Sequence, residues 1–448
     1  MSARGTSVAS GRSAYVLTTA HLTLAAFGAY FCMYAFRKPI AVARFDGAAF
    51  LGTGVELKTA LLVGQVAGYA LSKYLGIVVC SALSARSRAA TLVGFVVLAE
   101  LALVLFAVAP GGWKVAAMFL NGLPLGMVWG LVIRYLEGRR SSEVLLSGLS
   151  VSFIVSSGVV KDVGLWTMGR WGVSEAWMPA VTGSFFLLPF VACVALLEVA
   201  SPPDALDLAA RRERTSMGPL ERRAFLRRYA LGLAPLLFLY LFLTAYRDFR
   251  DNYGIEIFAQ LGYADTPALF TRAEAPAGLA VLVAMGLLVL IRDNLRGLLA
   301  TYALMALGLI VVLVTTLAFQ SGQVSGMAWM VGVGAGSYLA YVPVCSVFFD
   351  RLTAVGGSAG TAVFGIYLAD AIGYTGSAGT QLFKDLGAAT LSRADFFLDF
   401  SVGLSVLGLG CLLASAVGVL RAVPREDERG QALRAPTRER TRAPGVGY

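Results

Sequence analysis

Two arginines lie inside apolar stretches long enough to cross a membrane. Arg37 follows Tyr30 and Tyr34 at the spacing i, i+4, i+7, which places all three on one helical face. Arg247 lies deep in a second apolar stretch. An arginine at mid-membrane costs about 2.5–3.5 kcal/mol unless it faces a cavity, a partner or a ligand. Because a guanidinium forms two parallel hydrogen bonds with an oxyanion, the pair predicts a cavity that binds an anion.

Five further ionisable residues occur at membrane depth, namely Lys73, Lys161, Asp162, Asp251 and Asp370. Lys73 shares a helical face with Gln65 and Tyr69, although a lysine there can also reach the lipid headgroups. Asp251 follows Arg247 by four residues, which predicts an ion pair between them. Structural pairing inside a helix bundle is the alternative to a functional role for the other three.

The elements that position these residues are predicted to be transmembrane helices. Hydrophobic residues make up 57% of the chain and charged residues 14%, against about 45–50% and 25% in soluble domains. Spans of about 20 residues begin near Tyr15, Leu57, Ala89, Val115, Val144, Trp177, Tyr229, Ala268, Gly297, Gly326, Ala359 and Phe396. The fold class expected is an all-α membrane protein of twelve transmembrane helices.

The twelve spans divide into two pseudo-symmetric six-helix bundles. The domains predicted are a bundle at 1–200, a basic cytoplasmic linker at 201–228, a second bundle at 229–423 and a disordered tail at 424–448. The first span of the second bundle carries Tyr240, Thr244 and Arg247 at the same i, i+4, i+7 spacing as the first span of the chain. This repeat favours a duplicated transporter architecture.

The net charge of +10 follows membrane topology rather than a nucleic-acid partner. The arginines concentrate in alternate gaps and at both ends, so the positive-inside rule predicts cytoplasmic termini in an inner cell membrane. The five cysteines lie singly in apolar stretches and His21 is the one histidine. We therefore expect no metal, no cofactor and no enzyme chemistry.

Three segments carry a resemblance to a known family. Residues 30–39, 68–74 and 121–129 read YFCMYAFRKP, GYALSKY and NGLPLGMVW. They are similar to motifs of the major facilitator superfamily, and within it of the organophosphate:phosphate antiporters that carry glycerol 3-phosphate or hexose 6-phosphate. Arg247 and Asp251 match an arginine and an acidic residue of that family. The chain also resembles a divergent bacterial branch on the same scaffold.

The resemblance implies roles for individual residues. Arg37 and Arg247 would bind the phosphoryl group from the two halves. The residues expected to add charge or to line the cavity are Lys73, Lys161, Tyr30, Tyr34, Tyr69 and Tyr341. Two positions depart from the family: Ser156 stands about where the family has a histidine, and Asp370 has no counterpart.

The function expected is alternating-access transport of a small phosphorylated anion by a monomer, in exchange for inorganic phosphate. One alternative is a proton-coupled anion symporter in which Asp370 or Asp162 carries the proton. Another is a membrane receptor that binds a sugar phosphate without transporting it. Asp251, Asp370 and Asp162 are accordingly the coupling or ion-pair candidates.

Overall fold

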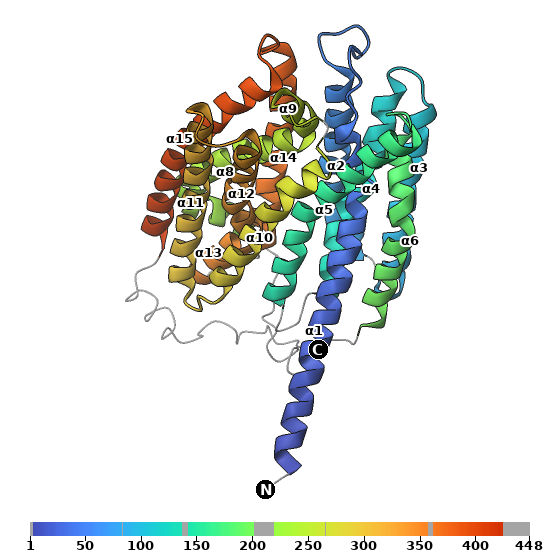
Figure 1. Ribbon diagram of the computed structural model, residues 1–448. Helices are drawn as coiled ribbons and strands as arrows, with labels where there is room; N and C mark the ends of the chain where they lie inside the picture. The colour runs from blue at the N-terminus through green and yellow to red at the C-terminus, as the bar shows by residue number, and fades with distance from the viewer. Residues whose placement is uncertain are drawn as a thin grey trace, which may run out of the picture.

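The computed structural model describes residues 3–82, 84–136, 142–200, 219–264, 266–356 and 362–423, which form a bundle of long helices (Figure 1). Apart from an isolated bridge between Ala49 and Glu56, these residues form no β-structure. The α-helices are α1 (Ala3–Tyr34), α2 (Leu57–Ala82), α3 (Arg88–Val108), α4 (Trp113–Leu136), α5 (Ser142–Trp171), α6 (Met178–Val199), α8 (Pro219–Asn252), α9 (Gly254–Gln260), α10 (Leu269–Val289), α11 (Asn294–Gln320), α12 (Gly326–Pro343), α13 (Phe349–Gly356), α14 (Ala362–Leu386) and α15 (Arg393–Ala422). The short elements are η1 (Pro39–Val42), η2 (Ala85–Ser87) and the π-helical η3 (Val344–Phe348).

The helices pack in two groups. Helices α1 to α6 contact one another, mainly through the pairs α2–α4, α3–α4 and α1–α6. Helices α8 to α15 form the other group, through α8–α15, α8–α14 and α11–α12. The groups meet where α5 packs on α10 and where α2 packs on α14. The blue-to-green and yellow-to-red parts of the chain accordingly lie on opposite sides of Figure 1.

The protein is a multi-pass membrane protein. Among the described residues, eight helices are long and apolar enough to cross a membrane: α3, α4, α6, α8, α10, α11, α15 and the continuous helix Gly326–Gly356 that joins α12, η3 and α13. A helix is also present at each of the other predicted spans, in α1, α2, α5 and α14. The number of twelve spans stays a prediction.

Close packing of α2 on α4 depends on the glycines of the NGLPLG segment. A Cβ atom on Gly122 would collide with the backbone carbonyl of Gln65, and one on Gly126 with the Ser72 side chain. Small residues let two helix backbones approach in a membrane, where packing rather than hydrophobicity drives association. The segment therefore holds α2 at a fixed depth, and α2 carries Gln65, Tyr69 and Lys73.

The second group of helices begins earlier than predicted. Helix α8 starts at Pro219, ten residues before the expected start of the second bundle at 229. Phe225 is buried, and Arg228 donates hydrogen bonds to the carbonyls of Gly356 and Ala422 at 3.3 Å, so this first part is packed. The predicted linker up to residue 218 and the predicted tail from 424 lie outside the described residues.

Candidate functional site

Arg37 and Lys38 lie in a break between two helical elements. Helix α1 ends at Tyr34 and η1 begins at Pro39, and Pro39 has no N–H group with which to continue the hydrogen bonds of α1. The carbonyls freed by the break are bonded by amides: Gln65 Nε2 donates to the Arg37 carbonyl at 3.1 Å, and Asn121 Nδ2 donates to the Phe36 carbonyl at 3.0 Å. The break is therefore held by side-chain hydrogen bonds, and it places two cations, Arg37 and Lys38, inside the bundle.

The Arg37 guanidinium is buried without a carboxylate partner. Its residue is 5% exposed, and it forms no ion pair with any acidic side chain in the described ranges. Its Cζ atom lies 3.9 Å from the centre of the Tyr69 ring, a cation–π contact that offsets part of the burial cost. Each of the other four cations of the central site pairs with an aspartate.

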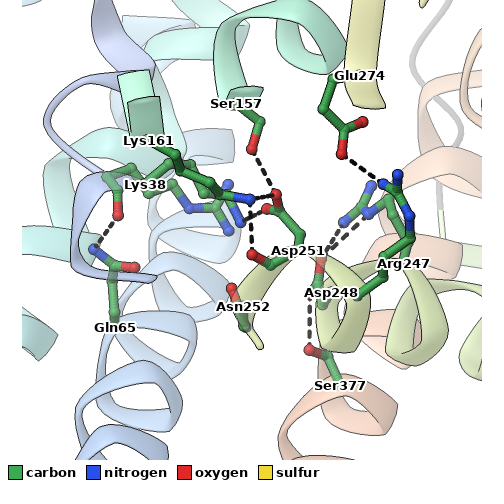
Figure 2. A network of polar contacts seen from close by, with 12 residues as sticks. Lys38, Gln65, Ser157, Lys161, Arg247, Asp248, Asp251, Asn252, Glu274 and Ser377 are labelled. Carbon is green, nitrogen blue, oxygen red and sulfur yellow. Dashed lines mark hydrogen bonds and ion pairs between the residues drawn. The ribbon is translucent and has the colours of Figure 1, made fainter. Parts of the chain in front are cut away.

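Arg247 pairs with its neighbour Asp248 rather than with Asp251, which corrects the predicted pairing. Its Nη2 donates to Asp248 Oδ1 at 2.7 Å, and Ser377 Oγ donates to Asp248 Oδ2 at 2.8 Å (Figure 2). Arg247 Cζ lies 4.1 Å from the centre of the Tyr341 ring. Each of the two arginines thus rests on the face of a tyrosine, Arg37 in one group of helices and Arg247 in the other.

Asp251 joins the two groups of helices at the centre of the site. Its carboxylate forms ion pairs with Lys38 and Lys161, and Ser157 Oγ donates to it at 2.5 Å (Figure 2). Lys161 also donates to the Asp251 carbonyl at 2.7 Å. The sequence predicts that Lys161 contacts the substrate. In the structure Lys161 instead forms an ion pair with Asp251, which also pairs with Lys38.

A small cavity lies among these charged side chains, and the side chains around it carry more positive than negative charge. Its lining consists of Tyr34, Arg37, Lys38, Phe153, Ser157, Arg247, Asp248, Asp251 and Tyr338. The central cations are Arg37, Lys38, Lys73, Lys161 and Arg247, and the central carboxylates are Asp248, Asp251 and Asp370. With all of them ionised, two positive charges stay unbalanced at a depth where charge is expensive.

Lys73 and Asp370 form a looser pair beside Tyr69. Lys73 Nζ lies 3.9 Å from Asp370 Oδ2 and 5.0 Å from the centre of the Tyr69 ring. Tyr240 donates to Asp370 Oδ1 at 3.2 Å. Because Tyr69 also contacts Arg37, the predicted residues Lys73 and Asp370 lie next to Arg37.

The predicted tyrosines occupy two positions relative to the cavity. Tyr34 lines it, and Tyr30 packs edge-on against Tyr34 and Trp129 with ring centroids 5.5 and 4.8 Å apart. The rings of Tyr69 and Tyr341 contact the guanidinium groups of Arg37 and Arg247. In the predicted stripe of Tyr240, Thr244 and Arg247, Thr244 instead donates to the Tyr240 carbonyl at 2.8 Å within its own helix.

Asp162 has a structural role that the sequence did not predict. Its two carboxylate oxygens accept the backbone N–H groups of Phe270 at 3.1 Å and Thr271 at 2.7 Å, at the start of α10. These N–H groups have no partner within their own helix, and a carboxylate also complements the helix dipole. Both oxygens of Asp162 therefore bond to the start of α10, and Asp162 does not line the cavity between Arg37 and Arg247.

Sequence reasoning missed Lys38, Asp248 and Ser157 as members of the site. Lys38 directly follows Arg37 and Asp248 directly follows Arg247, and helical periodicity assigns adjacent residues to different faces. The adjacent pair Arg37-Lys38 before Pro39 was the signal that could have identified Lys38. Where a helix is interrupted, two consecutive side chains can both point into the bundle.

Ion pairs also join the two groups of helices at the end of the molecule where α9 lies, farthest from the start of α1 (Figure 1). Lys58 Nζ donates to Glu256 at 2.5 Å. Arg393 Nη2 donates to Glu56 at 2.7 Å and to Asp385 at 3.0 Å. Asp385 in turn accepts the backbone N–H of Glu56 at 3.0 Å. This end is therefore closed by contacts between the groups.

Replacing Arg393 with Gln is expected to open this end more often. A partly exposed pair contributes about 1 kcal/mol, which corresponds to roughly a fivefold larger open population. The measurement is labelling of Thr59→Cys by a membrane-impermeant thiol reagent, in a variant whose five native cysteines are replaced. Thr59 is fully buried and bonds to Tyr253 across the groups at 2.7 Å. Unchanged labelling in Arg393→Gln would show that these pairs do not hold the end closed.

Comparison with known proteins identifies the family. Residues 39–421 match the model of a family described as "Family of unknown function (DUF5690)". The chain belongs to that family. No curated protein matches the chain in sequence.

Solved structures of several transporters resemble this chain in fold. One is a peptide transporter in complex with alafosfalin, with a TM-score of 0.58 and 15% identity over 91% of this chain and 96% of that one. Another is a bacterial homologue of the human lysosomal transporter Spinster, inward-facing and unoccupied, with a TM-score of 0.57 and 13% identity over 92% and 98%. These likenesses support the predicted major facilitator fold.

Proposed function

We propose that the protein is a secondary active transporter of a small phosphorylated anion, which it exchanges for inorganic phosphate by alternating access. The observation that carries the proposal is Arg37, a buried guanidinium that lines the central cavity and forms no ion pair within the described part of the chain. A buried cation of this kind is stabilised when an anion binds beside it.

The charge of the site favours a dianion over a singly charged substrate. Two positive charges of the central cluster have no carboxylate to balance them, and a phosphate monoester carries about −1.5 to −2 charges at neutral pH. Arg37 and Arg247 belong to different groups of helices and line the same cavity. Planar, two-pronged binding from both sides would draw the groups together around the phosphoryl oxygens.

Exchange, rather than one-way transport, results when the protein without a bound anion changes slowly between its two conformations. The packing contacts at α5–α10 and α2–α14 are the places where the two groups would rock against each other. An anion that binds most tightly with both arginines engaged lowers the energy of the intermediate closed on both sides. By the positive-inside rule, the site would lie in the inner membrane with both termini cytoplasmic.

The test is uptake of radiolabelled inorganic phosphate into proteoliposomes that are preloaded with phosphate. Wild-type protein is expected to exchange, and Arg247→Lys is expected to lower the rate about 100-fold, because an ammonium cannot reproduce the guanidinium fork. Equal elution of both proteins on size exclusion controls for folding. Well-folded wild type that gives no exchange would overturn phosphate antiport, and phosphate binding without flux would favour a receptor.

A further inference from the structure

We propose that Asp370 takes up a proton when the anion binds, so that proton and anion occupy the site together. The inference rests on the proposed anion transport and adds a coupled ion to it. It is drawn from the hydrogen bonds of the three central carboxylates, which differ in how fully their oxygens are occupied.

Two of the three carboxylates are saturated with donors. Asp248 accepts from Arg247 on one oxygen and from Ser377 on the other. Asp251 is held by two lysines and a serine. Hydrogen bonds and adjacent cations favour the ionised form of a carboxyl group. Protonation of either aspartate would therefore break several strong contacts at once.

Asp370 is held much less firmly. Its Oδ1 accepts one hydrogen bond, from Tyr240 at 3.2 Å. Its Oδ2 has Lys73 Nζ at 3.9 Å, which is beyond hydrogen-bond length, and accepts no hydrogen bond from the described residues. The side chain is 14% exposed. Of the three carboxylates, Asp370 thus loses least when a proton binds, and Oδ2 is the atom that receives it.

The groups that face Asp370 come from four other elements besides its own helix α14. They are Lys73 and Tyr69 on α2, Tyr240, Arg247 and Asp248 on α8, Tyr341 on α12, Cys345 on η3, and Tyr374 on α14. The nearest cation, Lys73, is the one that protonation releases.

Protonation changes the charge of the anion site directly. Neutral Asp370 no longer attracts Lys73, and Lys73 shares the Tyr69 ring with Arg37. The ammonium becomes available to the anion, and the positive excess of the cluster rises by one. Anion binding therefore favours proton binding, and the reverse holds by linkage. Each anion would cross the membrane together with a proton.

The test measures phosphate binding to purified full-length protein by titration calorimetry, at pH 6 and pH 8 and in buffers of different ionisation enthalpy. The wild type is expected to bind phosphate about tenfold more weakly at pH 8, within the 5–150-fold range typical of coupled sites. Asp370→Asn imitates the protonated residue and is expected to bind equally at both pH values, apart from the titration of phosphate itself. It should also take up fewer protons per phosphate than the wild type.

The outcomes separate this proposal from the proposed function. Wild type that binds no phosphate at either pH overturns both. Wild type that binds phosphate with the same proton uptake as Asp370→Asn overturns the role of Asp370 alone, as does an Asn variant that folds but loses binding at both pH values. Should Asp370→Asn fail to fold, Lys73→Gln gives a second test. Removing the ammonium is expected to move the fall in affinity to higher pH, and an unshifted fall would overturn the proposal.

Discussion

Replacing Arg37 with Gln is expected to abolish phosphate exchange while leaving the empty protein as stable as the wild type or more stable. Two charge-assisted hydrogen bonds to the anion disappear, at about 1.5–3 kcal/mol each, which predicts a loss of at least 100-fold. The empty protein, however, no longer buries a guanidinium that forms no ion pair, and such a charge costs about 2.5–3.5 kcal/mol at mid-membrane.

The measurement pairs the exchange rate with the thermal midpoint in detergent, each with and without phosphate. Wild type is expected to gain stability from phosphate and Arg37→Gln is not. Tyr69→Leu serves as the matched variant, because it keeps the cation and removes the ring beneath it. A marked fall in the midpoint of Arg37→Gln without phosphate would mean that Arg37 stabilises the fold, which the two-arginine site does not predict.

Asp251→Asn is expected to destabilise the protein by about 3–5 kcal/mol, the usual result of removing one partner of a buried ion pair. The substitution leaves Lys38 and Lys161 without their carboxylate, and Lys161 is 1% exposed. It also removes the contact that joins α8 to α5 and to the break after α1. Unfolding in mixed micelles with increasing SDS measures the change in free energy.

Adding Lys161→Met to Asp251→Asn is expected to recover part of the lost stability, because one of the two stranded lysines is then gone. Lys161→Met alone should be milder, since Asp251 keeps Lys38 and Ser157. A double variant that is less stable than Asp251→Asn would contradict the account, and would show that Lys161 stabilises the bundle through contacts other than Asp251.

The positions of the central arginines followed from hydropathy and spacing. Arg37, Arg247, Lys73 and Asp370 lie in apolar stretches, and a charge in such a stretch must turn toward the interior of the bundle. Their meeting in one region was thus predictable. The tyrosines that contact the two arginines, Tyr69 and Tyr341, lie on other helices, α2 and α12, so these contacts depend on packing between helices.

The pairing of charges was not predictable in the same way. Spacing along α8 favoured Asp251 as the partner of Arg247, yet Asp251 reaches Lys38 and Lys161 in the other group of helices. Helical periodicity orders residues within one helix, whereas an ion pair between helices depends on their relative depth and rotation. Those depend on distant contacts such as the glycine-mediated packing of α2 on α4.

The sequence by itself determined that the chain crosses a membrane and that ionisable residues lie at membrane depth, because both follow from composition along the chain. Only the tertiary structure decided how the cations and carboxylates pair. Lys38 and Lys161 converge on one aspartate and Arg247 bonds to its neighbour, so among the described residues Arg37 is the central cation that forms no ion pair. Likewise Asp162 and Asp370 both lie in apolar stretches, and the sequence does not distinguish their roles. In the structure Asp162 caps α10, whereas Asp370 faces the site. The physical reason is that a charge is satisfied by what lies within a few ångströms of it, and packing alone sets those distances.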